Sequence, residues 1–451
     1  MTKIIPFSKT TLANGVRLIL VPMEGVNSVA TSVMVAVGSR YETRKVNGVS
    51  HFLEHMVFKG TEKYPTTDDV NVIERIGGLQ NAYTDIDITN FHNKVLSTDW
   101  ALALEVNKEL AIKPRLEQKY VDKERDVILE EMKRYEDEPA SKVSEAFHTM
   151  MYPGTTLGLR TIGEADSLKA SDAGTLKDYH DTWYRPDRIV VVLAGKLVTS
   201  DKRQVTSKKN NEETYHLPAC RTGRSRIAYR VNEWFEELKG KSSGDIEKVV
   251  DKQEKPRVSI ITKPDAQQAH LTLGVRTFSR ASSERYAWQV FNLLMGVSFT
   301  SRLFKEIREK KGLCYHIRSG QDSWTDVGYW SIYAGVATDK VEEATKAIIN
   351  ELKKAVDKGV TAEEVKVAKK RLATMVAFQS ENPEFMNEYY GKQELYHEPI
   401  LTLDDYLRKI SDVTREDINA LIRKYLVTKT LNLALVWNKP EDEKLVRLLR
   451  I

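Results

Sequence analysis

Residues 16–38, VRLILVPMEGVNSVATSVMVAVG, contain two apolar stretches that predict consecutive β-strands joined by a short turn. The same pattern returns far along the chain, as RVSIITKP at 257–264 and HLTLGVRTFSR at 270–280. Pro22 corresponds to Pro264 at an offset of 242 residues. A repeated pair of strands indicates an internal duplication.

Two further landmarks keep nearly the same spacing. Arg40 follows the second strand and corresponds to Arg280, at an offset of 240 residues. Tyr184 and Tyr425 each end a predicted helix before an apolar strand, and they lie 241 residues apart. Because each half mixes strands with long helical patterns, the sequence predicts an α+β fold. It would contain two duplicated domains, each a mostly antiparallel sheet packed with helices.

The length of 451 residues also favours two domains over a single core. We place an N-terminal domain at 1–212 and a C-terminal domain of the same fold at 256–451. The stretch 213–255 is predicted to be a polar linker region, because Lys, Ser and other polar residues are frequent in and around it. Within it, segment 227–238 is compatible with either a helix or a strand.

Composition narrows the class of protein. The net charge of +5 comes from 69 basic and 64 acidic residues dispersed along the chain, which does not favour nucleic acid as a partner. No stretch is apolar enough to predict a membrane span, and the N-terminus has no signal-peptide pattern. The two cysteines, Cys220 and Cys314, are far apart and predict no disulfide framework. We therefore expect a cytoplasmic location.

The chemistry is concentrated in His51-Phe52-Leu53-Glu54-His55. On a helix, residues four apart share one face, so both imidazoles could bind one Zn²⁺ ion with Glu54 beside them as a base. The order H-x-x-E-H is the reverse of the commoner zinc-protease motif. Asn47 or Ser50 is the predicted cap of this helix, which would run to about Phe58. The motif also arises by chance, so it requires a third ligand nearby.

A second strong helical pattern, 116–138, supplies candidate acids. One face carries Tyr120, Glu124, Val127, Ile128, Glu131 and Tyr135. Carboxylates within an apolar face need partners, and a metal ion would explain Glu131, while a histidine or the ligand shell would explain Glu124. Glu130 falls on a face that looks solvated. The alternative is a pair of ordinary salt bridges; with H-x-x-E-H present we favour the metal, with water in the fourth position.

With these residues in place, the chain resembles the pitrilysin/insulinase family of zinc metallopeptidases, in particular its processing-peptidase-like branch. The resemblance covers nearly the whole chain except the region around 200–255. It is carried by four motifs: GVSHFLEHMVFKGT at 48–61, GGLQNAYTDIDIT at 77–89, ERDVILEEM at 124–132 and SRLFKEIREKKGLCY at 301–315.

The resemblance implies roles for individual residues. The family's third zinc ligand lies 76 residues after the second histidine, which is Glu131 here, and its accessory glutamate matches Glu124. An arginine and a tyrosine seven residues apart contact the substrate carbonyl in the family, and they match Arg308 and Tyr315. The ordinary interpretation of Arg308 is one charge on a solvated helical face.

Asn81, Ala82 and Tyr83 lie in a stretch whose alternation predicts a strand or hairpin. They could belong to an interior strand. The family implies instead an edge strand that binds an extended peptide by adding it to the sheet. In one respect the chain departs from noncatalytic members of the branch: residues 293–300 contain a single glycine where those proteins have a glycine-rich loop.

These observations predict a zinc-dependent endopeptidase that cleaves short or unfolded peptides inside a chamber, with catalytic roles for Glu54, Glu124, Arg308 and Tyr315. In this interpretation residues 1–212 form the zinc-binding catalytic domain and residues 256–451 the substrate-binding domain. The alternatives are a catalytically silent structural subunit of the same fold and a nonproteolytic zinc-binding or partner-binding protein. Related enzymes enclose substrate between four such domains, so this chain is expected to pair as a homodimer, with a heterodimer including a noncatalytic sister left open.

Overall fold

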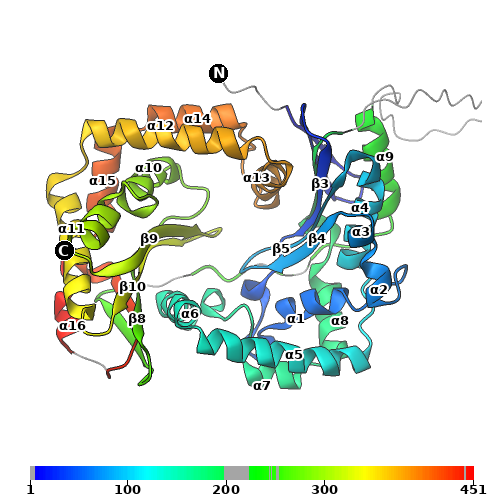
Figure 1. Cartoon of the computed structure of the whole chain (residues 1–451). Coiled ribbons are helices and arrows are strands. Elements are labelled where there is room, and N and C mark those ends of the chain that lie inside the picture. Colours follow the sequence, from blue (N-terminus) through cyan, green and yellow to red (C-terminus); the bar gives the residue numbers. More distant parts are fainter. Residues whose placement is uncertain (1–5, 198–222, 243, 245, 250–252, 441–442) are drawn as a thin grey trace, which may run out of the picture. The chain divides into compact units, whose positions relative to one another are not determined.

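The computed structural model describes residues 6–197, 223–242, 244, 246–249, 253–440 and 443–451. Within these ranges the chain divides into two compact units, each built on its own β-sheet with helices packed against it (Figure 1). This confirms the predicted α+β class.

The sheet of the first unit has the strand order β1-β2-β6-β3-β5-β4. Its strands are β1 (Ser8–Thr11), β2 (Arg17–Pro22), β3 (Ser28–Val35), β4 (Leu79–Thr84), β5 (Thr89–Leu96) and β6 (Ile189–Gly195). Neighbouring strands are antiparallel except for the parallel pair β2 and β6. Strand β6 is buried along its whole length, which indicates that both faces of the sheet are covered.

Helices cover this sheet on both faces. The helices of the unit are α1 (Val49–Val57), α2 (Thr67–Val70), α3 (Val72–Arg75), α4 (Trp100–Ile112), α7 (Ala165–Ala170), α8 (Ala173–Trp183), α9 (Gly223–Phe235) and α13 (Pro383–Leu395). Helix α4 packs on β3 and β5, and α13 packs on β6, β3 and β2 from the opposite side (Figure 1). The buried amide of Asn107 on α4 donates to the Thr31 carbonyl at 3.0 Å, and that of Asn387 on α13 donates to Ala30 and Val192 at 3.0 Å.

The sheet of the second unit repeats this design. Its order is β7-β11-β8-β10-β9, with one parallel pair, β7 and β11, within an otherwise antiparallel sheet. The strands are β7 (Arg257–Thr262), β8 (Gln268–Thr277), β9 (Cys314–Ser323), β10 (Gly328–Ala337) and β11 (Leu431–Trp437). This order matches β2-β6-β3-β5-β4 strand for strand, and the repeated sequence segments form β2, β3, β7 and β8.

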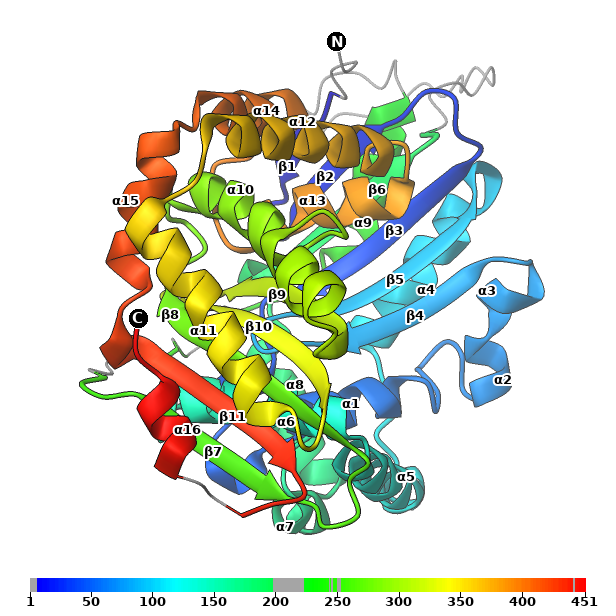
Figure 2. The same ribbon diagram turned by 60° about the vertical axis from the view of Figure 1, so that its left-hand side comes forward.

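The helical elements associated with the second sheet also lie on two faces. They are α6 (Pro139–Met151), α10 (Arg285–Gly296), the π-helical segment η6 (Phe304–Lys310), α11 (Val341–Lys358), α12 (Ala362–Gln379), α14 (Leu403–Asp412), α15 (Arg415–Tyr425) and α16 (Glu443–Leu448). Helix α10 contacts β9 and α11 contacts β10, and Figure 2 shows both lying across one face of the sheet. Helix α6 packs on β8 and β11.

The two units are not continuous halves of the chain, unlike the predicted domains 1–212 and 256–451. Residues 127–160 belong to the second unit and residues 377–404 to the first. Two helices explain the difference. Helix α6 buries Val143, Phe147 and Met151 against the second sheet, and α13 packs on the first. The helix α5 (Gln118–Asp137) runs through the division as one continuous element.

The predicted polar linker 213–255 contains a packed helix where the structure describes it. Helix α9 buries Ile227, Val231 and Phe235, which are four residues apart, and contacts β2. The Asn14 amide donates to the Phe235 carbonyl at 2.7 Å and helps to fix the helix end. Cys220 lies outside the described residues, whereas Cys314 is a buried free thiol.

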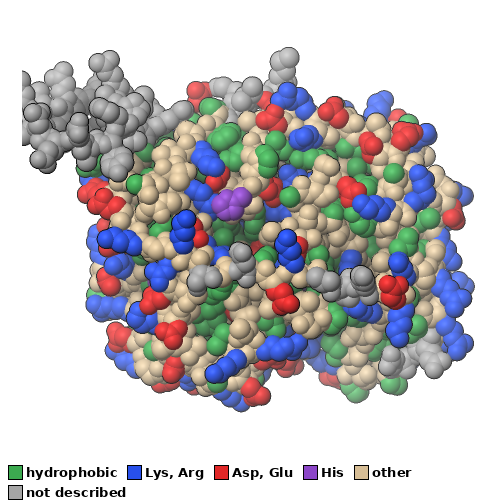
Figure 3. Space-filling view, turned by 180° about the vertical axis from the view of Figure 1, so that it is seen from behind, with side chains coloured by type: hydrophobic (Ala, Val, Ile, Leu, Met, Phe, Trp, Pro, Cys, Tyr) green, Lys and Arg blue, Asp and Glu red, His purple; other side chains and the backbone are tan. Residues whose placement is uncertain are grey.

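Charges of both signs are interspersed over the face shown in Figure 3, as expected from the small net charge. Among the helices of the described ranges, none combines the length and the apolar character that crossing a bilayer requires.

Candidate metal centre

Helix α1 carries the H-x-x-E-H motif on one side and an apolar surface on the other. Its apolar residues Phe52, Leu53, Met56 and Val57 are fully buried, whereas His51, Glu54 and His55 are half-buried. This amphipathic pattern anchors the helix against α8 and β4 and leaves the three polar side chains on the remaining side. The predicted helix is therefore present and ends at Val57, close to the predicted Phe58.

The N-terminus of α1 is not capped as predicted. Gly48 occupies the N-cap position with a left-handed φ of 94°, and neither Asn47 nor Ser50 caps the helix with its side chain. Glycine suits this position because an added Cβ would come within 2.8 Å of the Gly163 Cα.

Glu42 supplies the missing cap from outside the helix. Its Oε2 accepts hydrogen bonds from the Gly48 N–H at 2.7 Å and the Asn47 amide at 2.8 Å, and its Oε1 accepts from the Ser50 N–H at 2.8 Å. The side chain is buried, and burial raises the pKa of Glu42 to about 7 despite these hydrogen bonds. Sequence reasoning missed Glu42, because a single acid in a polar turn follows no helical or strand period.

The third predicted ligand lies next to the two histidines. His51, His55 and Glu131 form a group in which one ligand atom from each residue lies within 4.8 Å of the others. All three side chains are half-buried, so the group is accessible from solvent. Glu131 also accepts a hydrogen bond from the Arg134 guanidinium at 3.3 Å. Two imidazoles and a carboxylate at this spacing could hold a metal ion.

The histidines are suited to bind a cation. Their ring centroids are 4.6 Å apart, with the planes inclined by 62°. Burial, followed by the charge of His55, lowers the pKa of His51 to about 3. His51 is therefore a neutral imidazole near pH 7, which is the form that binds metals.

Glu124 orients His55. Its Oε1 lies 3.0 Å from the His55 Nδ1, and its Oε2 lies 2.7 Å from the Lys59 ammonium. When Nδ1 carries the proton in this hydrogen bond, the lone pair of Nε2 is available to a metal ion. Burial acts to raise the pKa of Glu124, but the hydrogen bonds from His55 and Lys59 outweigh it and lower the pKa overall.

The two aliphatic residues of the predicted α5 face, Val127 and Ile128, differ in burial. Ile128 is fully buried, but Val127 is 51% exposed and lies outside the buried stripe to which the sequence assigned it. The helix rotates by about 100° per residue, so a face defined by six residues over four turns includes some at its margin. Glu130 lies on an exposed face and pairs with Lys133 at 2.6 Å, as expected.

Asn81, Ala82 and Tyr83 lie on β4, an edge strand of the first sheet. Strand β4 pairs with β5 on one side, and helix α1 contacts β4. The Tyr83 hydroxyl donates to the Glu388 Oε1 on α13 at 2.9 Å, and burial, reinforced by this carboxylate, raises its pKa. Of the two alternatives, the structure selects the edge strand.

Arg308 and Tyr315 meet in the second unit. Arg308 lies in η6 and Tyr315 on the edge strand β9. The Arg308 guanidinium carbon lies 4.9 Å from the centre of the Tyr315 ring and 4.7 Å from that of Phe304. The Tyr315 side chain is 79% exposed, so its hydroxyl is accessible.

The predicted site residues thus form three local groups. His51, His55 and Glu131 come together with Glu124 behind His55, and Glu54 is the residue before His55 on α1. Asn81, Ala82 and Tyr83 form the edge strand that contacts α1. Arg308 and Tyr315 form a stacked pair within the second unit.

Comparison with known families agrees with this arrangement. The family described as Insulinase (Peptidase family M16) matches residues 18–165, and the Peptidase M16 inactive domain matches residues 225–372. These matches fall on the two halves of the duplication.

Individual relatives extend the likeness over nearly the whole chain. The uncharacterized zinc protease YmxG of Bacillus subtilis is 31% identical, over 94% of this chain and 97% of its own length. An uncharacterized zinc protease of Streptomyces coelicolor is also 31% identical, over 93% of this chain and 87% of its own length.

Solved structures share the fold. A protease from Helicobacter pylori superposes with a TM-score of 0.85 at 21% identity, covering 97% of this chain and all of the other. A Pseudomonas fluorescens structure described as a peptidase M16 inactive domain gives a TM-score of 0.84 at 19% identity, with the same coverage. The chain therefore belongs to the insulinase family, peptidase family M16.

Proposed function

We propose that this protein is a zinc-dependent endopeptidase that cleaves short or unfolded peptides. The observation that carries the proposal is the grouping of His51, His55 and Glu131, whose ligand atoms lie within 4.8 Å of one another. Glu54 lies on the same helix, between the two histidines in sequence.

The residues fit zinc better than Mg²⁺ or Ca²⁺. Two neutral imidazoles and one carboxylate are a typical catalytic zinc donor set, whereas Mg²⁺ and Ca²⁺ prefer oxygen ligands. When bound, zinc supplies a Lewis acid that polarises a peptide carbonyl and makes a water molecule more acidic.

In this proposal Glu54 acts as the general base and then the general acid. It takes a proton from the attacking water and passes it to the leaving amine, which requires the carboxylate form at the start of the cycle. Glu124 keeps His55 in one tautomer and orientation through the 3.0 Å contact between its Oε1 and the His55 Nδ1.

The substrate would bind as an added strand on β4. An edge strand offers backbone N–H and C=O groups to an extended peptide, and the contact between β4 and α1 supports placing that peptide close to the motif. Recognition through the backbone at Asn81, Ala82 and Tyr83 would give a loose sequence preference. Arg308 and Tyr315 are proposed to donate hydrogen bonds to the negative charge that develops on the carbonyl oxygen.

We further propose that two copies of this chain enclose the peptide. The metal-binding group and the Arg308 and Tyr315 pair are present in one chain, so a homodimer would contain every proposed catalytic residue. Sedimentation of the purified chain alone tests this, because a monomer would favour a requirement for a different partner chain.

Glu54→Gln tests the catalytic role. The amide keeps the size of the side chain but cannot accept the proton, so we expect zinc content to be unchanged and peptide cleavage to fall by about 10²- to 10⁴-fold. Cleavage is followed with a pool of quenched fluorescent peptides, zinc by elemental analysis, and a chelator followed by zinc addition tests metal dependence. Glu130→Gln, an exposed change on α5, is the matched control.

Two results would contradict the proposal. Full activity in Glu54→Gln would show that Glu54 is not the general base. Activity that survives complete zinc removal would show that the reaction does not need the metal. A chain that binds zinc but cleaves nothing in the pool, alone or as a dimer, would instead favour a catalytically silent subunit.

A further inference from the structure

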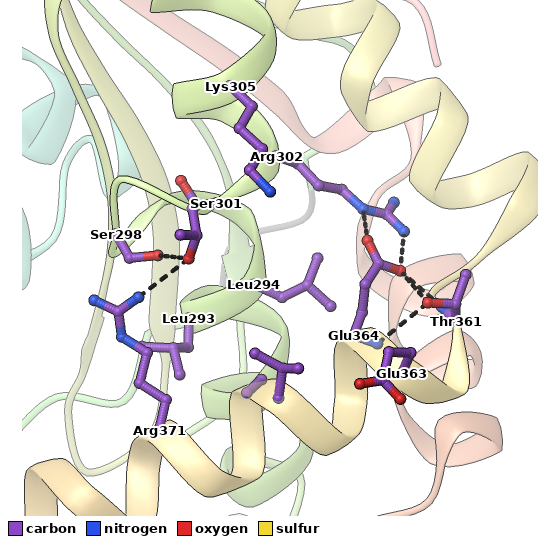
Figure 4. A pocket seen from close by; sticks show the side chains of 13 residues that line it. Leu293, Leu294, Ser298, Ser301, Arg302, Lys305, Thr361, Glu363, Glu364 and Arg371 are labelled. Atoms are coloured by element: carbon purple, nitrogen blue, oxygen red, sulfur yellow. Dashed lines mark hydrogen bonds and ion pairs between the residues drawn. The ribbon is translucent and has the colours of Figure 1, made fainter. Parts of the chain in front are cut away.

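The second unit contains a cavity that involves none of the residues of the proposed metal centre. It has a volume of about 370 Å³ and lies between α10, the segment that leads into η6, and the first half of α12 (Figure 4). Cavities of this size accept small molecules rather than polypeptide segments. Its lining combines aliphatic side chains with several charged and hydroxyl groups.

The aliphatic part comes from two helices. Leu293 and Leu294 project from α10, and Val367 and Ala368 from α12. Val367 is 54% exposed, although a valine of a packed helix is normally buried. This surface suits a short hydrocarbon chain, because moving apolar surface out of water is favourable.

One charged pair in the lining is already satisfied. The Arg302 guanidinium donates two hydrogen bonds to Glu364, each of 2.7 Å. Glu364 Oε2 also accepts from the Thr361 N–H and hydroxyl at 2.8 and 2.9 Å, which completes the cap of α12. Arg302, Glu364 and the N-terminus of α12 therefore need no ligand.

Two other cations differ from Arg302. Within the described part of the chain, neither Lys305 nor Arg371 makes an ion pair with a carboxylate. Arg371 donates to the Thr300 hydroxyl at 3.3 Å, and this hydroxyl lies 3.1 Å from that of Ser298. Figure 4 shows Lys305 and Arg371 bordering the cavity from different sides. Two cations beside an aliphatic surface form an amphipathic recognition pattern.

The sign and number of the charges limit the ligand. The lining also contains Glu363 and Glu364, so a dianion such as phosphate would be repelled at one side. Glu363 lies 4.0 Å from Lys366 on the exposed side of α12. A single negative charge with an apolar tail fits the remaining positive and aliphatic surfaces together.

We propose that this cavity binds a small aliphatic carboxylate. Lys305 and Arg371 hold the carboxylate, and Leu293, Leu294 and Val367 contact the aliphatic part. Two sources share this chemistry: the C-terminal residue of a peptide ending in Leu or Val, and a free short-chain acid. This site is separate from the proposed peptidase activity and needs no zinc.

Ligand-observed NMR titration of the zinc-free full chain tests the proposal with three probes. N-acetyl-leucine represents a peptide C-terminus, hexanoate represents a free acid, and N-acetyl-leucinamide has the same shape as the first but no charge. We expect the acids to bind with Kd values of about 1 mM, as is usual for ligands of eight to twelve heavy atoms. The amide should bind at least about tenfold more weakly, because it cannot form the charged hydrogen bonds.

Variants then locate the binding. Lys305→Gln and Arg371→Gln should each weaken binding of the acids by about fivefold or more, because each removes one charged donor. Lys310→Gln is the matched control, since Lys310 is an exposed lysine of the same η6 segment that pairs with Glu306 at 3.1 Å. Circular dichroism checks that each variant is folded.

The outcomes separate the sources and can overturn the proposal. Binding of both acids shows that a carboxylate and an alkyl chain suffice. Binding of N-acetyl-leucine alone identifies a peptide C-terminus as the ligand, and binding of hexanoate alone identifies a free acid. The proposal is overturned if neither acid binds, if the amide binds as well as the acid, or if Lys305→Gln and Arg371→Gln bind as the wild type does. None of these results depends on whether the protein cleaves peptides.

Discussion

Helices α1 and α10 occupy equivalent places in the two units but carry different chemistry. Each follows the second strand of its repeat, β3 or β8. Each also packs against the helix, α8 or α15, that precedes the strand of its sheet latest in the sequence, β6 or β11. Helix α1 keeps His51, Glu54 and His55 half-buried on one side. Helix α10 is buried over nearly its whole surface.

The polar residues of α10 are used for packing. Gln289 accepts a hydrogen bond from the Tyr406 hydroxyl at 2.7 Å. Asn292 accepts from the Trp330 indole at 2.7 Å and the Ser319 hydroxyl at 2.6 Å. The duplicated scaffold therefore fixes where the helix lies, and a few side chains decide whether it offers a metal site.

Glu131→Gln should have the largest effect on the difference between α1 and α10, because it removes a proposed metal ligand. An amide is a poor zinc ligand, so we expect the affinity for zinc to fall by about a thousandfold or more, while the zinc-free protein keeps its fold. Titration against a chromophoric chelator measures the affinity. Glu130→Gln, one residue away on the exposed face, should leave it unchanged. Equal losses in both variants would show that Glu131 is no ligand.

Much of the fold could be predicted because duplication leaves regular spacings. Pro22 and Pro264, with Tyr184 and Tyr425, mark strands that occupy equivalent positions in the two sheets. The assignment of helices to sheets could not be predicted in the same way. An amphipathic helix such as α6 or α13 shows that it has a buried face, but its sequence does not say which of two similar sheets covers that face.

The candidate metal site likewise combines residues that the local sequence pattern reveals with residues that only the tertiary structure brings together. Helical periodicity placed His51 and His55 on one face, and the acid within an apolar stripe pointed to Glu131. Glu42 gave no such signal, because it reaches the N-terminus of α1 from a preceding turn and its cap depends on tertiary structure. The left-handed Gly48 was likewise not recognised as the N-cap, although glycine is accepted there.

Glu124→Gln refines the comparison between α1 and α10, because Glu124 contacts His55 of α1 and has a proposed role in orienting it. The amide oxygen can still accept from the His55 Nδ1, but the negative charge and the ion pair with Lys59 are lost. We expect zinc affinity to fall by about 10- to 100-fold, as is usual for partners of metal-bound histidines. Lys59→Gln, which leaves the contact with His55 intact, should cost less than tenfold. A larger loss in Lys59→Gln than in Glu124→Gln would contradict this order.

The smallest expected effect concerns the acids at the N-termini of the two helices. Burial raises the pKa of Glu42 at α1 to about 7. At α10, burial also acts to raise the pKa of Glu284, but hydrogen bonds from Lys424 and Tyr425 outweigh it and lower the pKa overall. The two acids should therefore contribute to stability with opposite dependence on pH.

The direction follows from proton binding. Folded Glu42 binds its proton more tightly than the unfolded chain, so its contribution is full below the ordinary pKa of 4.5 and is lost as the pH rises to about 7. Glu284 contributes above 4.5 and loses this contribution as the pH falls through its lowered pKa. Urea unfolding of the zinc-free protein from pH 4 to 7.5, with Glu42→Gln and Glu284→Gln, measures both. The free energy of unfolding of the wild type relative to Glu42→Gln should fall by about 1–3 kcal/mol as the pH rises from 4.5 to about 7. A difference that stays constant or grows with pH would show that Glu42 is held as an ordinary carboxylate, as Glu284 is.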